Sequence, residues 1–144
     1  MLAFFMQVSC GFRPAYKADA YNENFLTFVE ITPIRTIEGT NFYNHLKSIF
    51  PSAKKSLYVL NTTLSFSNSY NVIQSNSDIL RETQNINVTY QLIDKKDLKV
   101  LTYGTFSKMS SYSTNFSLYS NSVIRQDSMS DLAENAAEEV RNRL

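Results

Sequence analysis

The sequence predicts an α+β fold of the two-layer sandwich type, with two helices on one face of a mixed or antiparallel sheet of about four strands. Several segments alternate apolar and polar residues, which is typical of strands with one buried face. Two other segments repeat apolar residues every three or four positions, which is typical of amphipathic helices. The order is strand, helix, three strands, helix. Both helices must bury an apolar stripe, and one face of the sheet can cover both.

Length and composition fit one domain. A chain of 144 residues with 43% hydrophobic residues can bury about two-thirds of its unfolded surface. A net charge of +1 lacks the concentrated positive field of nucleic-acid binders, so we expect no nucleic-acid partner. No segment approaches the ~18 to 20 consecutive apolar residues that span a bilayer, so membrane attachment would require an anchor.

The first half of the domain predicts a strand, a helix and a second strand. Residues 25–34 are mostly β-branched or aromatic, and Pro33 keeps the end of this strand out of a central ladder. Thr40 is the predicted N-cap of a short amphipathic helix that Pro51 ends. Residues 56–66 alternate and predict a strand that continues or bends toward Val72 and Ile73. The apolar residues of the helix are Phe42, Leu46, Ile49 and Phe50.

The second half predicts a hairpin and a final helix. Residues 74–85 are polar and predict a connector, whereas residues 86–92 alternate most regularly and predict a strand with one wet face. The turn at 94–97 leads into a strand over 100–107. Within that strand, Gly104 indicates a bulge or a close backbone approach.

Residues 107–122 are rich in Ser, Tyr and Asn, and their pattern leaves open an extended strand or a loop. From Ser128 onward, apolar residues recur at helical spacing, and Asp131 completes an analogue of a capping box. The apolar stripe of this predicted helix consists of Met129, Leu132, Ala133, Ala136, Ala137 and Val140.

Cys10 is the only cysteine and follows an apolar run and Val8-Ser9. A single thiol in this position is typical of the site where bacteria attach lipid. Residues 1–9 contain no Lys or Arg, so they form only an incomplete signal segment, and we expect the true start to lie upstream or the chain to begin late. Residues 10–24 are then a lipidated N-terminus and tether, and residues 25–144 a single domain. Alternatively, Cys10 is an ordinary small buried residue.

The inventory of reactive residues does not favour an enzyme. One His (His45) and one Cys lie on opposite sides of the polar tether, which is poor material for a thiol nucleophile and its base. Three glycines cannot supply a phosphate-binding loop, and His45 has no His or Cys neighbour with which to share a metal. We therefore expect no catalytic residues, no cofactor and no metal.

The segment Cys10-Gly11-Phe12-Arg13-Pro14-x-Tyr16 resembles the start of mature LptE-type LPS-assembly lipoproteins, whose alphaproteobacterial form commonly reads C-G-F-R-P-L-Y. Ala15 stands where Leu is usual. The resemblance extends along the chain. It includes Ile31–Arg35, Arg81 ahead of Val88-x-Tyr90-x-Leu92-x-Asp94, and the terminal Ala136-x-x-x-Val140-x-x-Arg143-Leu144. It implies the element order βαβββα, which agrees with the order expected from the residue pattern.

The resemblance implies a lipoprotein held at the periplasmic face of the outer membrane by lipid, including palmitate, on Cys10. It implies that the domain plugs the LptD β-barrel and helps to assemble lipopolysaccharide (LPS) at the cell surface. One polar sheet face and mixed surface charge would suit the polar lumen of a barrel. An alternative is a generic periplasmic lipoprotein that binds a lipid or stabilises another envelope complex. A more remote one is a cytosolic binding domain with an unmodified Cys10.

Basic residues in LptE-type proteins are thought to meet LPS phosphates, and Arg81 and Arg125 are the candidates here. A guanidinium matches phosphate oxygens bidentately, and both residues stand near predicted strand ends. Cations at strand ends also commonly serve solubility. This alternative explanation applies to both arginines and equally to Lys54, Lys55, Lys95, Lys96 and Lys99.

Overall fold

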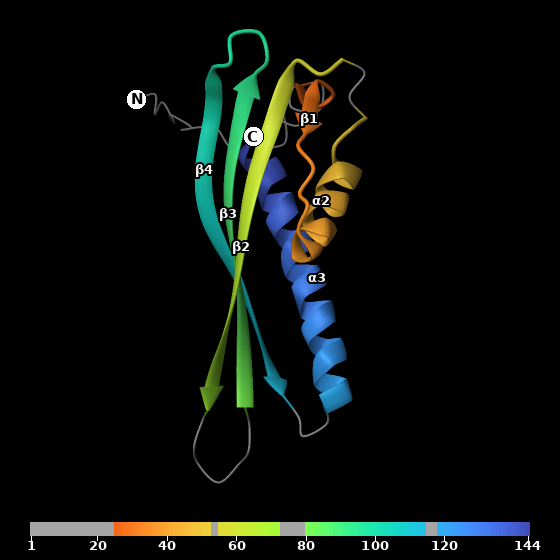
Figure 1. The fold of residues 1–144 in the computed structure, drawn as a ribbon, viewed down its shortest axis with the longest axis vertical. Coiled ribbons are helices and arrows are strands. Elements are labelled where there is room, and N and C mark those ends of the chain that lie inside the picture. Colours follow the sequence, from red (N-terminus) through yellow and green to blue (C-terminus); the bar gives the residue numbers. More distant parts are fainter. Residues whose placement is uncertain (1–24, 53–54, 73–79, 115–117) are drawn as a thin grey trace, which may run out of the picture.

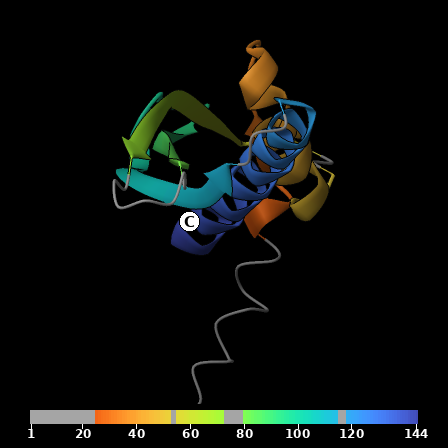
Figure 2. The same ribbon diagram turned by 90° about the horizontal axis from the view of Figure 1, so that it is seen from below.

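The computed structural model describes residues 25–52, 55–72, 80–114 and 118–144. The predicted signal segment and tether, with Cys10, lie outside these residues. The elements are β1 (Val29–Ile31), α2 (Ile37–Ile49), β2 (Tyr58–Val72), β3 (Leu80–Asp94), β4 (Val100–Thr114) and α3 (Leu118–Arg143). The strands form one sheet in the order β1-β2-β3-β4, with β1 parallel to β2 and the other pairs antiparallel. The helices form a second layer on one side of the sheet (Figures 1 and 2), which confirms the predicted α+β sandwich.

The core lies between the sheet and the helices. Alternate residues of β3 (Ile86, Val88, Tyr90 and Leu92) are all buried, whereas the residues between them are less buried and face the other side. Burying one such large apolar side chain contributes about 1.5 to 3 kcal/mol. The period-two pattern therefore predicted this strand correctly, because one face of the sheet is covered and the other is not.

Small residues let α3 approach its neighbours closely. Ala133, Ala136 and Ala137 are fully buried, as is Val140. α3 packs against α2, β4 and β3. On α2, Phe42 and Leu46 are fully buried one turn apart and complete the same core with Leu60 of β2. The predicted apolar stripes of both helices are confirmed, except that Met129 lies outside this core.

The first strand is shorter than predicted. Residues 25–34 contain only three strand residues, because β1 pairs with the first three residues of β2 and Pro33 then follows. Phe25 and Leu26 form a helical turn instead. Leu26 is buried and the Phe25 ring lies 4.9 Å from the Tyr58 ring, so these apolar residues serve packing rather than the ladder.

The N-cap of α2 is Thr36, not Thr40. Thr36 has extended backbone geometry, and its Oγ1 accepts a hydrogen bond from the Gly39 backbone N at 3.1 Å. The Thr40 hydroxyl lies inside the helix and donates to the Thr36 carbonyl at 3.0 Å. Gly39 is required beside the cap, since a Cβ there would clash with the Ile34 side chain. The helix ends at Ile49, shortly before Pro51, as predicted.

The polar connector predicted at 74–85 is partly wrong. β3 already begins at Leu80, and residues 80–85 pair with β2 on one side and with β4 on the other. Their polar side chains led to the prediction of a loop, yet these residues continue the two-residue period of β3 toward its start. Two of them, Glu82 and Gln84, are buried. Residues 74–79 of the predicted connector lie outside the described residues.

The hairpin between β3 and β4 is confirmed. At its turn, the Asp94 Oδ1 accepts a hydrogen bond from the Lys96 backbone N at 2.8 Å. Gly104 lies opposite Tyr90, and a Cβ at Gly104 would stand 2.6 Å from the Tyr90 hydroxyl oxygen. The close approach was therefore the correct alternative. The register shift lies elsewhere, between Leu92 and Ile93.

The open region at 107–122 divides between a strand and a helix. β4 extends to Thr114, and α3 begins at Leu118 rather than at Ser128. Ser128 is not a cap, because it lies well inside α3 and its hydroxyl is bonded to that of Ser110 at 2.9 Å. The first part of α3 carries no clear apolar stripe because polar contacts hold it on the sheet, so periodicity alone missed it.

Candidate functional site

The two halves of the molecule differ in what lies between sheet and helix. β1 and α2 lie beside one half, whereas the other half contains the end of β2, the start of β3, the end of β4 and the start of α3 (Figure 1). We call the second the distal half. Its inner sheet face carries Glu82 and Gln84, with exposed fractions of 0% and 1%. A carboxylate in such a place needs a partner, because burying an isolated charge is very costly.

Arg125 of α3 supplies that partner. Its Nη2 donates to Glu82 Oε2 at 2.9 Å, and its Nε donates to the same oxygen at 3.3 Å. Nη2 also lies 3.4 Å from the Tyr70 hydroxyl, and Gln84 Nε2 donates to the Arg125 carbonyl at 3.3 Å. The hydrogen bond to Glu82 raises the pKa of Arg125 above its ordinary value. Arg125 therefore closes the site as a permanent cation.

Two tyrosines flank the buried carboxylate. Tyr70 of β2 and Tyr112 of β4 are the register partners of Glu82 on either side. Burial raises the pKa of Tyr112, and the neighbouring Glu82 raises it further, so this hydroxyl is neutral at physiological pH. Among the described residues, Glu82 Oε1 and Gln84 Oε1 are buried without a hydrogen-bond partner. We call Tyr70, Glu82, Gln84, Tyr112 and Arg125 the distal cluster.

The structure does not bring the two predicted LPS-binding arginines together. Arg81 precedes Glu82 on β3, so its side chain points to the opposite face of the sheet, where it is exposed. Among the described residues, no carboxylate forms an ion pair with Arg81. Arg125 lies on the helix side, and its side chain is 45% exposed although Glu82 pairs with it. Of the two cations, Arg81 is therefore the more available to an outside anion.

Arg125 also lines a groove between α2 and the first half of α3. The groove has a volume of about 580 Å³. Ile37, at the start of α2, is 89% exposed beside it, and Met129 of α3 contributes a second apolar side chain. The other lining residues are polar: Glu38, Thr40, Asn41, Ser122 and Gln126. This combination of apolar and polar groups with one arginine suits an amphipathic ligand.

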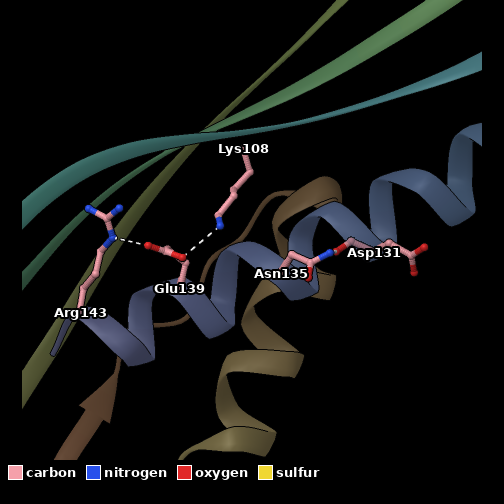
Figure 3. A network of polar contacts seen from close by, with 5 residues as sticks. All are labelled: Lys108, Asp131, Asn135, Glu139 and Arg143. Atoms are coloured by element: carbon pink, nitrogen blue, oxygen red, sulfur yellow. Dashed lines mark hydrogen bonds and ion pairs between the residues drawn. The ribbon is translucent and has the colours of Figure 1, made fainter. Parts of the chain in front are cut away.

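A second set of charged contacts links α3 to β4 in the other half (Figure 3). Glu139 accepts hydrogen bonds from Lys108 Nζ at 3.0 Å and from Arg143 Nε at 2.7 Å. The Arg143 guanidinium also lies 4.7 Å from the centre of the Phe106 ring. The bond from Arg143 and then that from Lys108 lower the pKa of Glu139. These groups satisfy one another, so we assign the network to holding α3 on the sheet.

The remaining polar candidates contact neighbouring side chains of the fold. Lys95 pairs with Glu30 and donates to Ser56, at the end of the molecule that contains the β3–β4 turn. His45 Nε2 lies 3.5 Å from Glu138 Oε1. Within the described ranges, no three His, Cys, Asp or Glu side chains are grouped as a metal site would require. Among the helices in those ranges, none combines the length and apolar character needed to cross a bilayer.

Sequence reasoning found Arg125 but missed its partners. Glu82 and Gln84 were placed in the predicted connector, because their polarity hid the strand period, and Tyr70 lay on the predicted continuation of the preceding strand without an assigned role. A usable signal was present: Glu82 and Gln84 stand two residues apart in phase with Ile86 and Val88. Extending the period backward would have placed both side chains on the buried face.

The fold is that of several bacterial lipoproteins of known structure. A proposed lipoprotein from Caulobacter crescentus CB15 matches with a TM-score of 0.67 at 18% identity, over 86% of this chain and 92% of its own. The rare lipoprotein B from Shewanella oneidensis matches with a TM-score of 0.60 at 10% identity, over 80% and 89%. A minor lipoprotein from Acinetobacter baumannii gives 0.55 at 13% identity, over 80% and 86%. At these identities the likeness shows a shared fold.

Sequence similarity then defines the family. The uncharacterized protein RP188 of Rickettsia prowazekii (strain Madrid E) is 38% identical over 136 residues, which cover 94% of this chain and 87% of that protein. The chain belongs to the family of RP188. No protein-family model matches the sequence.

Proposed function

We propose that this protein is an outer-membrane lipoprotein, anchored by lipid on Cys10, that plugs an LptD-type β-barrel and assists LPS assembly. The observation that carries the proposal is the coincidence of two independent features. The fold matches that of proteins described as lipoproteins over at least 80% of this chain, and the Cys10 segment resembles the lipid-attachment site of LptE-type proteins. Neither feature requires the other.

The outer face of the sheet supports a role inside a water-lined pore. Apart from Arg81 and Met109, the middle and distal parts of this face carry mostly small uncharged polar side chains, and several of these are joined across strands. Thr83 bonds to Ser111 at 2.8 Å, and Ser107 donates to Asn87 at 2.7 Å. Such hydroxyl and amide groups can exchange hydrogen bonds with a polar wall, so they would not be buried there without partners. The lumen of an outer-membrane barrel is polar in this way.

The groove between α2 and α3 favours a second candidate, a periplasmic lipoprotein that binds a lipid without a barrel partner. Its exposed Ile37 and Met129 would fit an acyl chain, and its two charged residues, Arg125 and Glu38, would fit a polar headgroup. The two candidates share the anchor and differ in the partner. Co-purification therefore separates them.

Lipidation is tested by metabolic labelling with a fatty-acid analogue. The gene is expressed with an extended start, and wild type is compared with Cys10→Ala. We expect the wild-type protein to incorporate the fatty-acid label and to be found in the membrane fraction. The Cys10→Ala variant should do neither. Absence of label from both proteins would remove the anchor from the proposal.

Partner choice is tested by solubilising outer membranes in mild detergent and purifying the tagged protein. We expect a large outer-membrane β-barrel to be recovered with it in stoichiometric amount. Recovery of lipid without a barrel would favour the second candidate.

An LPS contact at Arg81 is tested by the salt dependence of binding. We expect Arg81→Ala to weaken LPS binding more at low than at high ionic strength, because the contact would be charge-assisted and screened by salt. Lys96→Ala, which removes an exposed cation at the far end of the same strand pair, is the matched control. Equal low-salt affinities for Arg81→Ala and wild type would exclude this residue from the contact.

A further inference from the structure

β4 forms one edge of the sheet along its full length of 15 residues. Figure 1 shows it on the side of the sheet away from β1. Within the described part of the chain, β3 is its single neighbour in the sheet, so no strand pairs with the other side of β4. At about 3.3 Å per residue, this open edge is roughly 50 Å long.

Two common protections of an exposed edge, proline and outward-facing charge, are missing from β4. Natural edge strands are commonly short, interrupted by proline or bulges, or studded with charged side chains. β4 contains no proline, and its register shift lies at one end, beside Val100. Its single charged residue, Lys108, lies on the inner face, where Glu139 neutralises it, so the outward face of β4 carries no charge. An edge of this length and composition is open to pairing with another strand.

The outward side chains of β4 add apolar surface to that edge. Tyr103 and Met109 are 76% and 71% exposed, and Leu101 is 46% exposed. They alternate with small polar residues on the same side of the strand, namely Thr105, Ser107, Ser111 and Ser113. Alternation of large and small residues is what allows two such strands to interlock across a shared edge.

We propose that β4 is a self-association edge, at which a second copy of this chain pairs its own β4 antiparallel around a twofold axis at Ser107. In this register, Tyr103 lies opposite Ser111 and Met109 opposite Thr105, so each large residue meets a small one. The diagonal neighbour of Tyr103 is Met109 of the second copy, within reach of an aromatic ring. Sulfur–aromatic contacts of this kind are favourable.

The charge pattern is compatible with the same register. Lys108 lies opposite Phe106 of the second copy and not opposite another lysine. A symmetric contact also uses the same surface on both copies, which is the commonest form of homo-oligomer. The inference goes beyond the proposed function, because it concerns the free protein and requires neither lipid on Cys10 nor a barrel.

Cysteine cross-linking tests the register in the full chain. Cys10→Ser removes the natural thiol, and Ser107→Cys then places one thiol at the proposed axis. Directly opposite Cβ atoms of paired strands lie about 4.5 to 5.5 Å apart, so mild oxidation or a short thiol cross-linker should join two copies. Thr89→Cys is the matched control: it is also exposed but on the central strand β3, and in this register it lies roughly 20 Å from its counterpart, about 14 Å across the strands and about 13 Å along them.

Charge substitution at the axis provides the second test, read by sedimentation over a concentration series. Ser107→Lys places like charges opposite each other, so we expect the dimer to weaken about fivefold, whereas Thr89→Lys leaves it unchanged. Mixing Ser107→Lys with Ser107→Glu should restore a heterodimer. Circular dichroism confirms that each variant is folded.

A chain that stays monomeric at every concentration would overturn the proposal. A dimer that resists Ser107→Lys, or one that Thr89→Cys cross-links as well as Ser107→Cys, would overturn it too, because association would then use another surface. Each result is independent of whether a barrel co-purifies, so failure here and failure of the proposed function are distinguishable.

Discussion

At the scale of single residues, the Glu82–Arg125 pair sets the chemistry of the distal half. Glu82 is fully buried and Arg125 is 45% exposed, so the arginine shields the carboxylate from solvent on one side and faces the groove on the other. The two roles are linked: any substitution that removes the cation from the groove also uncovers a buried negative charge.

We expect Arg125→Ala to lower the free energy of unfolding by about 3 kcal/mol. This is the lower end of the range for breaking a buried ion pair, since water can partly replace a half-exposed guanidinium. In a Glu82→Gln background the same substitution should cost about 1 kcal/mol, because no buried charge is left unpaired. Urea unfolding of the four proteins measures the difference. Equal losses in the two backgrounds would contradict a dominant ion pair.

The structural role of Arg125 also decides how LPS binding is best tested. A loss of binding in Arg125→Ala would mix a lost contact with a loosened distal half. Arg81 is exposed on the other sheet face, and among the described residues it forms no ion pair on which the fold depends. Arg81→Ala is therefore the cleaner test of the two candidates.

At the scale of elements, helix boundaries were harder to predict than helix faces. Thr36 and Thr40 both precede part of the apolar stripe of α2, and four residues separate them. The backbone conformation decides between them, since only Thr36 is extended and has its hydroxyl at the Gly39 backbone N. That choice depends on Ile34 packing against Gly39, a contact outside the helix pattern.

We expect Thr36→Ala to destabilise the protein by about 1 kcal/mol, the usual cost of losing an N-cap hydroxyl. Thr40→Ala should cost little, because its hydroxyl bonds to a carbonyl within the helix and lies at the surface. Thermal unfolding of the two variants, followed by circular dichroism at 222 nm, makes the comparison. A larger loss for Thr40→Ala would place the helix start where the sequence pattern predicted it.

At the scale of the whole molecule, different forces hold the two halves together. The half with β1 and α2 is packed around large apolar side chains, and Glu139 joins Lys108 of β4 to α3 at its surface. The distal half depends on the buried pair and on hydroxyl contacts such as Ser110–Ser128. We therefore expect the distal half to be the more sensitive to polar substitutions.

Glu139 gives this architecture a pH dependence of known sign. Its pKa is lowered below 4.5 in the folded protein, so its contribution is fully present above about 4.5 and is lost as the pH falls through the folded value. We expect Glu139→Gln to be less stable than wild type at pH 7, by at most about 1 kcal/mol, and equally stable near pH 2. Urea unfolding at both values measures this.

Glu134→Gln is the control for that experiment, since Glu134 is an exposed carboxylate on the same helix without an ion pair among the described residues. It should match wild type at both pH values. A stability difference for Glu139→Gln that persists near pH 2 would show that packing, rather than the ion pairs, is responsible.

The sequence by itself determined the class of fold, the order of its elements and the core strand over 86–92, because the burial of one face imposes a period that local patterns record. It also placed a candidate anchor at Cys10, which lies outside the described residues, so that anchor stays a prediction. The same period extends back to Gln84 and Glu82, but only the tertiary structure showed that these polar side chains are buried and that Arg125 covers Glu82. The physical reason is that a polar side chain is buried when a distant segment supplies its partner, and no local pattern records a partner 43 residues away.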